Sequence, residues 1–196
     1  YDSPTIPDNE FDELYRELKS IENQNPDFVS PDSPTQVIGS KIRGGFKKVR
    51  HAKPMMSLNN AANIEEFKSF YNKTTSDISK RVTMYAEPKF DGLAIALTYI
   101  GGNLQSAVTR GDGNVGEDVT SNIKTIKSLP LKLLTKKRPE KLIVAAEVYS
   151  LIADFKQINN VLEQSQMKTF ANPRNFAAGT VRQLDPVVAF KRNLQI

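Results

Sequence analysis

A short turn between two apolar segments limits the fold of this 196-residue chain more than any other feature of its sequence. Gly101-Gly102-Asn103 separates the apolar runs at residues 93–99 and 104–109. Because a turn of this length joins antiparallel neighbours, we expect these two runs to form a β-hairpin. A further apolar run covers residues 142–149, and the order of elements is not a strict βαβ repeat. The sequence therefore predicts an α+β domain rather than a doubly wound sheet.

Helical patterns occur at several other places along the chain. In residues 7–22 a proline stands at the first position, acidic residues follow it, and apolar residues recur at helical spacing. Further helices are predicted at residues 64–71, from about Glu117, at residues 152–164, and from Asn172 toward Leu184. The run at residues 82–87 is predicted to be a strand.

The first helix is followed by a natural boundary. Residues 25–34 are rich in proline, aspartate and serine and cannot continue a helix. We therefore divide the chain into a partial N-terminal helical lobe, residues 1–26, and a main domain, residues 27–196. Residues 1–40 hold 2 basic and 9 acidic side chains, which leaves 25 basic and 13 acidic side chains for the rest. The excess of basic side chains after residue 40 suits a polyanion such as nucleic acid or a nucleotide. Charge that only keeps the protein in solution is the alternative.

The composition excludes several classes of protein. The chain has no cysteine and one histidine, His51, so it cannot build a disulfide framework, a thiolate zinc site or a histidine metal cluster. Its mean hydropathy of -0.43 comes with no apolar run long enough to span a bilayer. No secretory signal is visible at the start of the sequence. We therefore expect a soluble protein of the cytoplasm.

The segment Glu87-Pro88-Lys89-Phe90-Asp91-Gly92 is the sharpest candidate for chemistry. In an extended chain Glu87, Lys89 and Asp91 would share one face, with the lysine between two carboxylates. A lysine at the rim of a sheet can act as a nucleophile if its pKa is lowered by its surroundings. The alternative interpretation is a ladder of ion pairs on the surface.

Three glycines form a second candidate. Gly111, Gly113 and Gly116 spell the dinucleotide-binding pattern after a strand and before a predicted helix. Asp112, however, would place a carboxylate where a pyrophosphate should lie, and the expected acidic residue about 20 positions further on is missing. A tight loop that turns Arg110 toward a phosphate or sugar is the other interpretation.

The third candidate lies near the end of the chain. Arg174 and Arg182 are eight residues apart on one side of the predicted helix, and the small residues Ala177, Ala178 and Gly179 lie between them. Two arginines beside a smooth surface suit contact with a phosphate backbone. Helix packing on a neighbouring element would explain the small residues equally well.

Together these segments resemble the adenylation region of NAD-dependent DNA ligases. The resemblance rests on residues 4–12, 31–36, 51–61, 87–92, 109–120 and 170–186, which occur in the order of the family and span nearly the whole chain. It implies a nucleotidyltransferase fold preceded by a small helical lobe. It also implies that Lys89 takes AMP from NAD through a phosphoramide bond and releases nicotinamide mononucleotide. The AMP would then pass to the 5′-phosphate of nicked double-stranded DNA, and the 3′-hydroxyl would displace it.

The resemblance assigns roles to further residues. These are Ser57, Leu58 and Glu87 for the adenosine pocket, Asp91 and Arg110 for ribose or phosphate, Glu147 for placing Mg²⁺, Asp8, Phe11 and Asp12 for the nicotinamide half, and Arg174, Arg182 and Arg192 for DNA. An acidic, aromatic lobe would favour the positively charged nicotinamide ring.

The chain also departs from the family. Ala145-Ala146 precede Glu147 where the family usually has Arg-Gly, and Phe11 stands where a tyrosine is usual. The sequence ends before the later family lysines, the OB-fold and the other DNA-encircling modules, so we expect a ligase fragment. Such a fragment would be a monomer from the bacterial nucleoid that does not seal nicks by itself, and its reaction with NAD would be slow or undetectable.

Three other functions remain open at this point. They are a dinucleotide-binding oxidoreductase built on Gly111, Gly113 and Gly116, a basic module that binds DNA without catalysis, and an ATP-using ligase. The acidic N-terminal lobe is foreign to an ATP-using ligase, and covalent labelling with AMP from NAD would separate a ligase from the other two.

Overall fold

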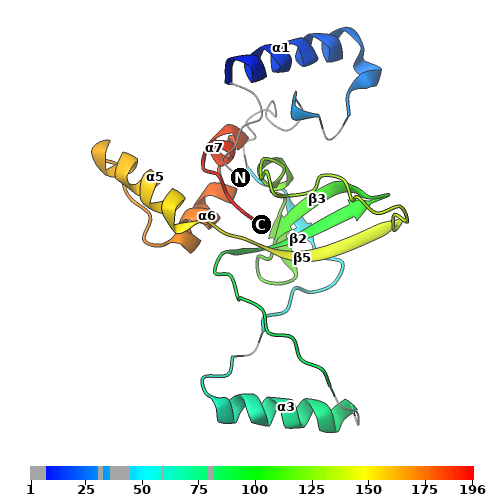
Figure 1. Cartoon of the computed structure of the whole chain (residues 1–196), viewed down its shortest axis with the longest axis vertical. Coiled ribbons are helices and arrows are strands. Elements are labelled where there is room, and N and C mark those ends of the chain that lie inside the picture. The colour runs from blue at the N-terminus through cyan, green and yellow to red at the C-terminus, as the bar shows by residue number, and fades with distance from the viewer. Residues whose placement is uncertain (1–7, 31–32, 36–44, 59, 79–81) are drawn as a thin grey trace.

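A three-stranded antiparallel sheet forms the centre of the molecule (Figure 1). The computed structural model describes residues 8–30, 33–35, 45–58, 60–78 and 82–196. The elements in these ranges are α1 (Asp8–Gln24), η1 (Pro26–Phe28), β1 (Lys48–Arg50), α3 (Ile64–Ile78), β2 (Leu93–Ile100), β3 (Asn103–Thr109), β4 (Val115–Glu117), α4 (Thr120–Ile123), β5 (Lys141–Val148), α5 (Ile152–Gln164), α6 (Pro173–Val181) and α7 (Pro186–Lys191). The mixed architecture and the antiparallel sheet confirm the predicted α+β class.

The strand order in the sheet is β3-β2-β5, so β2 lies in the middle. Leu97 of β2 faces Ala107 of β3 on one side and Val144 of β5 on the other. Gly101 and Gly102 form the turn between β2 and β3, as the sequence predicts. A separate two-stranded sheet pairs β1 with β4.

The core lies between one face of the sheet and the C-terminal helices. Ile95 on β2 and Phe176 on α6 are fully buried, and Ile123 of α4 joins the same cluster. The Phe176 ring makes T-shaped contacts with the rings of Phe155 and Phe170, with ring centroids 6.3 and 5.2 Å away. This packing holds α6 against the sheet and so fixes the surface that α6 presents to the neighbouring cleft.

The helix ends follow from local sequence. Asn172 caps α6 by accepting the Asn175 backbone N–H, and Asp185 caps α7 by accepting the Val187 N–H. A proline occupies the first turn of each helix, where its missing N–H costs nothing. The sequence predicts a helix that runs from Asn172 toward Leu184, but α6 ends at Val181 with Arg182 as its C-cap. Asp185 has the extended backbone of an N-cap, so a new helix starts there.

Two helices stand apart from the sheet in Figure 1, α1 at the top and α3 at the bottom. None of the described α3 side chains is buried, and Phe67 and Phe70 are both substantially exposed. The predicted helix at residues 64–71 is confirmed and continues to Ile78. Of the helices in the described ranges, none combines the length and apolar character that a membrane span requires.

Two of the sequence predictions are wrong, and the first is the strand expected at residues 82–87. Residues 82–90 form neither helix nor strand, and Tyr85 is 87% exposed. In the described part of the chain no strand pairs with this run, and a strand without a partner leaves its backbone groups unpaired. The common strand face expected for Glu87, Lys89 and Asp91 is therefore not formed.

The helix predicted from about Glu117 is also displaced. Glu117 belongs to β4, where its N–H donates to Thr109 Oγ1 over 2.9 Å. The helix α4 begins only at Thr120 and is four residues long. Asp118 accepts both the N–H and the hydroxyl of Thr120, which starts the helix three residues later than predicted.

Candidate active site

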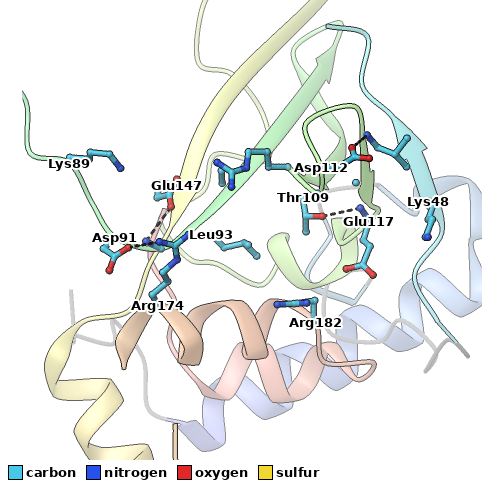
Figure 2. Close-up of a pocket in the computed structure, with 16 residues that line it drawn as sticks. Lys48, Lys89, Asp91, Leu93, Thr109, Asp112, Glu117, Glu147, Arg174 and Arg182 are labelled. Carbon is cyan, nitrogen blue, oxygen red and sulfur yellow. Dashed lines mark hydrogen bonds and ion pairs between the residues drawn. The ribbon is translucent and has the colours of Figure 1, made fainter. Parts of the chain in front are cut away.

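A cleft of about 540 Å³ opens where β2 begins and where β3 and β5 end (Figure 2). Residues from β1, β4 and α6 complete its wall. Six of the candidate residues line it, namely Lys89, Asp91, Arg110, Glu147, Arg174 and Arg182. The fold therefore brings all three candidate segments of the sequence to one place.

The residues just after Lys89 are attached to β5 and to Tyr149, which follows it. The ring of Phe90 stacks on Tyr149 with a centroid distance of 4.5 Å. The backbone N–H of Gly92 donates to Glu147 Oε1 over 3.1 Å. Lys89 thus stands between an exposed segment without regular structure and a segment that is fixed to the sheet.

An ion pair joins the same segment to α6. Arg174 Nη1 lies 3.2 Å from Asp91 Oδ1, and both side chains are more than half exposed. Figure 2 shows this contact as a dashed line at the end of the cleft where Lys89 lies. Arg174 therefore contacts the lysine-bearing segment directly, and its remaining N–H groups are free to face a phosphate.

The glycine loop, residues 109–117, packs on its own backbone. A Cβ on Gly111 would lie 1.9 Å from the Val115 carbonyl oxygen, and one on Gly116 would lie 1.7 Å from that of Thr109. The last three residues of the loop form β4 rather than the start of a helix. A dinucleotide site needs its glycines for the approach of a pyrophosphate at a helix N-terminus, so this loop does not have that architecture.

Asp112 stabilises the turn within this loop. Its Oδ1 accepts the N–H groups of Asn114 and Val115, each over 2.8 Å. These bonds, that of Val115 first, hold the pKa of Asp112 below its usual value because they favour the charged carboxylate. The Asp112 carboxylate, which does not suit a pyrophosphate site, thus stabilises the turn of its own loop.

His51 holds the loop from outside. Its Nε2 lies 3.1 Å from the Thr109 carbonyl oxygen and 3.2 Å from that of Arg110. The backbone continues this contact, because the His51 N–H donates to Asn114 and the Met55 N–H donates to Gly113. The lone histidine is a structural contact that fixes the backbone of Arg110.

Several candidate residues lie outside the cleft lining. Ser57, Leu58 and Glu87 are exposed, and Leu58 is exposed to 77%. Asp8, Phe11 and Asp12 belong to α1, but their side chains lie outside the described part of the chain. The roles assigned to these six residues stay predictions.

Arg192 is placed differently from the other two candidate arginines. Its guanidinium lies over the rings of Phe170 and Phe176, at 5.3 and 5.7 Å from their centroids, and donates to Thr180 Oγ1. Burial lowers its pKa because it disfavours the charged form. The rings and the hydroxyl partly offset that cost, so these contacts hold the end of α7 against α6.

Two charged residues of the cleft are absent from the sequence-based candidates. Lys48 of β1 and Glu117 of β4 face each other in register and both line the cleft. Glu117 directly follows Gly116, so its position next to the glycine pattern is a signal in the sequence that points to it. No sequence signal points to Lys48, because it reaches the cleft only through the pairing of β1 with β4.

The carboxylates of the cleft do not form a dedicated metal site. Among the described residues no group of three or more histidine, cysteine, aspartate or glutamate side chains could hold a metal ion. Mg²⁺ commonly uses only one or two protein carboxylates together with water and substrate phosphates. Glu147 and Asp91 both line the cleft and retain acceptor capacity beyond their observed bonds, so they fit that mode of binding.

Comparison with known families decides the class of protein. A family model described as the NAD-dependent DNA ligase adenylation domain matches residues 43–196. The chain belongs to this family. A second model, the DNA ligase-like N-terminal NAD+-binding domain, matches residues 1–39. The family expected from the sequence motifs is thereby confirmed.

A DNA ligase from Shouchella clausii (strain KSM-K16) is similar to the whole chain. The two sequences are 46% identical over 195 residues, which is 100% of this chain and 29% of that protein. The chain thus spans less than a third of the length of this relative. The adenylation-domain match covers every residue that lines the cleft.

Proposed function

We propose that this chain carries the AMP-accepting site of an NAD-dependent DNA ligase, with Lys89 as the nucleophile. The observation that carries the proposal is the convergence of Lys89, Asp91, Arg110 and Glu147 in one cleft, within the part of the chain that the adenylation family matches. The match of residues 1–39 to an NAD+-binding domain supports NAD rather than ATP as the AMP donor.

The first step is a transfer of AMP to the lysine amine. The neutral Nζ of Lys89, its proton having gone to solvent, attacks the α-phosphorus of NAD. A P–N bond forms, the P–O bond to nicotinamide mononucleotide breaks, and that nucleotide leaves with the electron pair. The nitrogen then releases its second proton to solvent, which leaves the phosphoramide. Arg110 lies in the same cleft, where a fixed cation stabilises charge on the phosphates as it shifts to the leaving group.

The contacts beside Lys89 favour such a step. Phe90 is held by Tyr149 and Gly92 by Glu147 of β5, so the main chain next to the nucleophile has a fixed position. A nucleophile held in this way loses less freedom at the moment of attack. Bound at Glu147 and Asp91, Mg²⁺ would neutralise charge on the phosphates.

We further propose that the cleft edge formed by α6 contacts the DNA backbone. Arg174 and Arg182 both line the cleft and both project from α6 or its end. A ligase must act on any sequence, and arginine contacts to phosphates give affinity without reading bases. Transfer of AMP to the 5′-phosphate and attack by the 3′-hydroxyl would then follow at this edge.

The experiment that tests the nucleophile is intact mass measurement after incubation with NAD and Mg²⁺, followed by peptide mapping. We expect a gain of one AMP on the peptide that contains Lys89, and no gain in Lys89→Ala. Lys48→Ala is the matched control, because Lys48 is the other lysine of the cleft lining and its replacement should leave Lys89 as the site of labelling. AMP on another lysine, or labelling that survives Lys89→Ala, would overturn the assignment.

A further inference from the structure

A buried asparagine holds the end of α6 on both sides of Arg182. Asn122 lies in α4 and is only 3% exposed. Its Nδ2 donates to the Val181 carbonyl oxygen over 2.8 Å and to the Gln183 carbonyl oxygen over 2.6 Å. These two acceptors belong to the residues directly before and after Arg182.

Both N–H donors of the Asn122 side chain are used in this contact. A carboxamide nitrogen has two N–H donors, and here each donor meets one carbonyl group. The last carbonyl groups of a helix have no partner within the helix, and α6 ends at Val181. Asn122 therefore bonds the last carbonyl group of α6, that of Val181, and the carbonyl group of Gln183 just beyond the helix. It does so from a buried position, where an unmade bond is costly.

Arg182 itself lies on the opposite, open side. Its side chain is exposed and lines the cleft, as Figure 2 shows. Its main chain is fixed between the two carbonyl groups that Asn122 binds. The point from which the guanidinium projects is thus set by a residue that does not itself line the cleft.

We propose that Asn122 is a positioning residue for Arg182, which it holds at the cleft for contact with a DNA phosphate. The proposal rests on the proposed function, in which Arg182 contacts the DNA backbone. Arg174, at the other end of the same helix, is held separately by Asp91. A change at Asn122 should therefore affect the contribution of Arg182 and leave that of Arg174 intact.

The test is the salt dependence of nicked-duplex binding, measured by fluorescence anisotropy on the 196-residue chain. Asn122→Asp keeps the size of the side chain but replaces both donors with acceptors. We expect it to lower the slope of log K against log salt by about one unit, the same change that we expect for Arg182→Ala. Asn122→Asp combined with Arg182→Ala should lower the slope by no more than either single variant does. Asn122→Asp combined with Arg174→Ala should lower the slope by the sum of the two single effects.

Thr125→Val is the matched control. Thr125 is buried in the turn after α4, and its hydroxyl donates to the Asn122 carbonyl oxygen over 2.6 Å, so this variant also loses a buried hydrogen bond. It leaves both bonds to α6 in place and should bind DNA with the wild-type slope. If Asn122→Asp does not fold, Asn122→Ser takes its place with one remaining donor.

Backbone hydrogen exchange separates this inference from the proposed function. Loss of the Asn122 bonds should speed exchange at the amides of Arg182 and Gln183, and Thr125→Val should not. If Arg182→Ala leaves the salt slope unchanged, the proposed DNA contact is wrong, while exchange still decides whether Asn122 holds this segment. Wild-type exchange in Asn122→Asp, or additive losses with Arg182→Ala, would overturn the positioning role.

Discussion

Replacing Gly116 by alanine tests whether the glycine loop is built for its own packing or for a ligand. Gly116 lies in β4 with an ordinary backbone conformation, so alanine brings no strain in φ. Its new Cβ would lie 1.7 Å from the Thr109 carbonyl oxygen and 3.0 Å from Val108 Cγ1. Since carbon and oxygen atoms ordinarily approach no closer than about 3.3 Å, the two backbones must separate by roughly 1.5 Å.

The expected cost follows from what this separation disrupts. An added methyl in a packed site costs about 1–3 kcal/mol. The bond from the Glu117 N–H to Thr109 Oγ1 spans the same two backbones, and its loss adds about 1 kcal/mol. Taking about 3 kcal/mol in total, we expect the melting temperature of a domain of this size to fall by about 6–12 °C.

The matched control is Gly101→Ala in the hairpin turn. Gly101 has φ of +54°, and a Cβ added to it would meet nothing within 4 Å, so it tests backbone conformation without a clash. We expect a cost of about 1 kcal/mol, or about 2–4 °C. Thermal unfolding of both variants without any nucleotide is the assay. If Gly116→Ala melts with the wild type, or no lower than Gly101→Ala, the close packing of the loop is not what requires glycine.

Two further variants test charges in the cleft. The lowered pKa of Asp112 means that its bonds to Val115 and Asn114 stabilise the fold above its unfolded pKa of 3.8 and lose that effect as the pH falls through the folded pKa. In denaturant titrations the wild type should therefore lose more stability than Asp112→Asn below about pH 4, and parallel pH curves would contradict this. Arg174→Ala should change the free energy of unfolding by less than about 1 kcal/mol, because its ion pair with Asp91 is largely exposed. The same variant should lower the salt slope of DNA binding by about one unit, and an unchanged slope would remove the contact.

The elements that the sequence predicts best are those whose signals are local. The hairpin at Gly101-Gly102-Asn103 and the helix Ile152–Gln164 form as predicted, because turn residues and apolar spacing act over a few positions. The run at residues 82–87 has strand composition but no partner in the sheet, and pairing is a property of the whole fold. Lys48 was missed for the same reason, since only the pairing of β1 with β4 brings it to the cleft.

Position along the chain likewise does not show how a charge is used. Arg174, Arg182 and Arg192 look equivalent in the sequence. In the structure Arg174 and Arg182 both line the cleft, and Arg174 also pairs with Asp91. Arg192 instead packs over two phenylalanine rings. Burial and partners distinguish them, and both depend on contacts between distant segments. The sequence motif identifies which residues gather at the site, while the packing decides what each one contacts.

The balance of charge in the cleft shows how a site with four carboxylates would still offer cations to phosphates, as the proposed function requires. The cations that line it are Lys48, Lys89, Arg110, Arg174 and Arg182, and the carboxylates are Asp91, Asp112, Glu117 and Glu147. Asp112 and Glu147 accept backbone N–H groups rather than cations. Among the described residues only Arg174 of these cations forms an ion pair, and that pair is exposed. Two of the carboxylates are thus bound by backbone N–H groups and not by the arginines. Arg110 and Arg182 therefore keep their positive charge for a diphosphate or a DNA strand in the cleft.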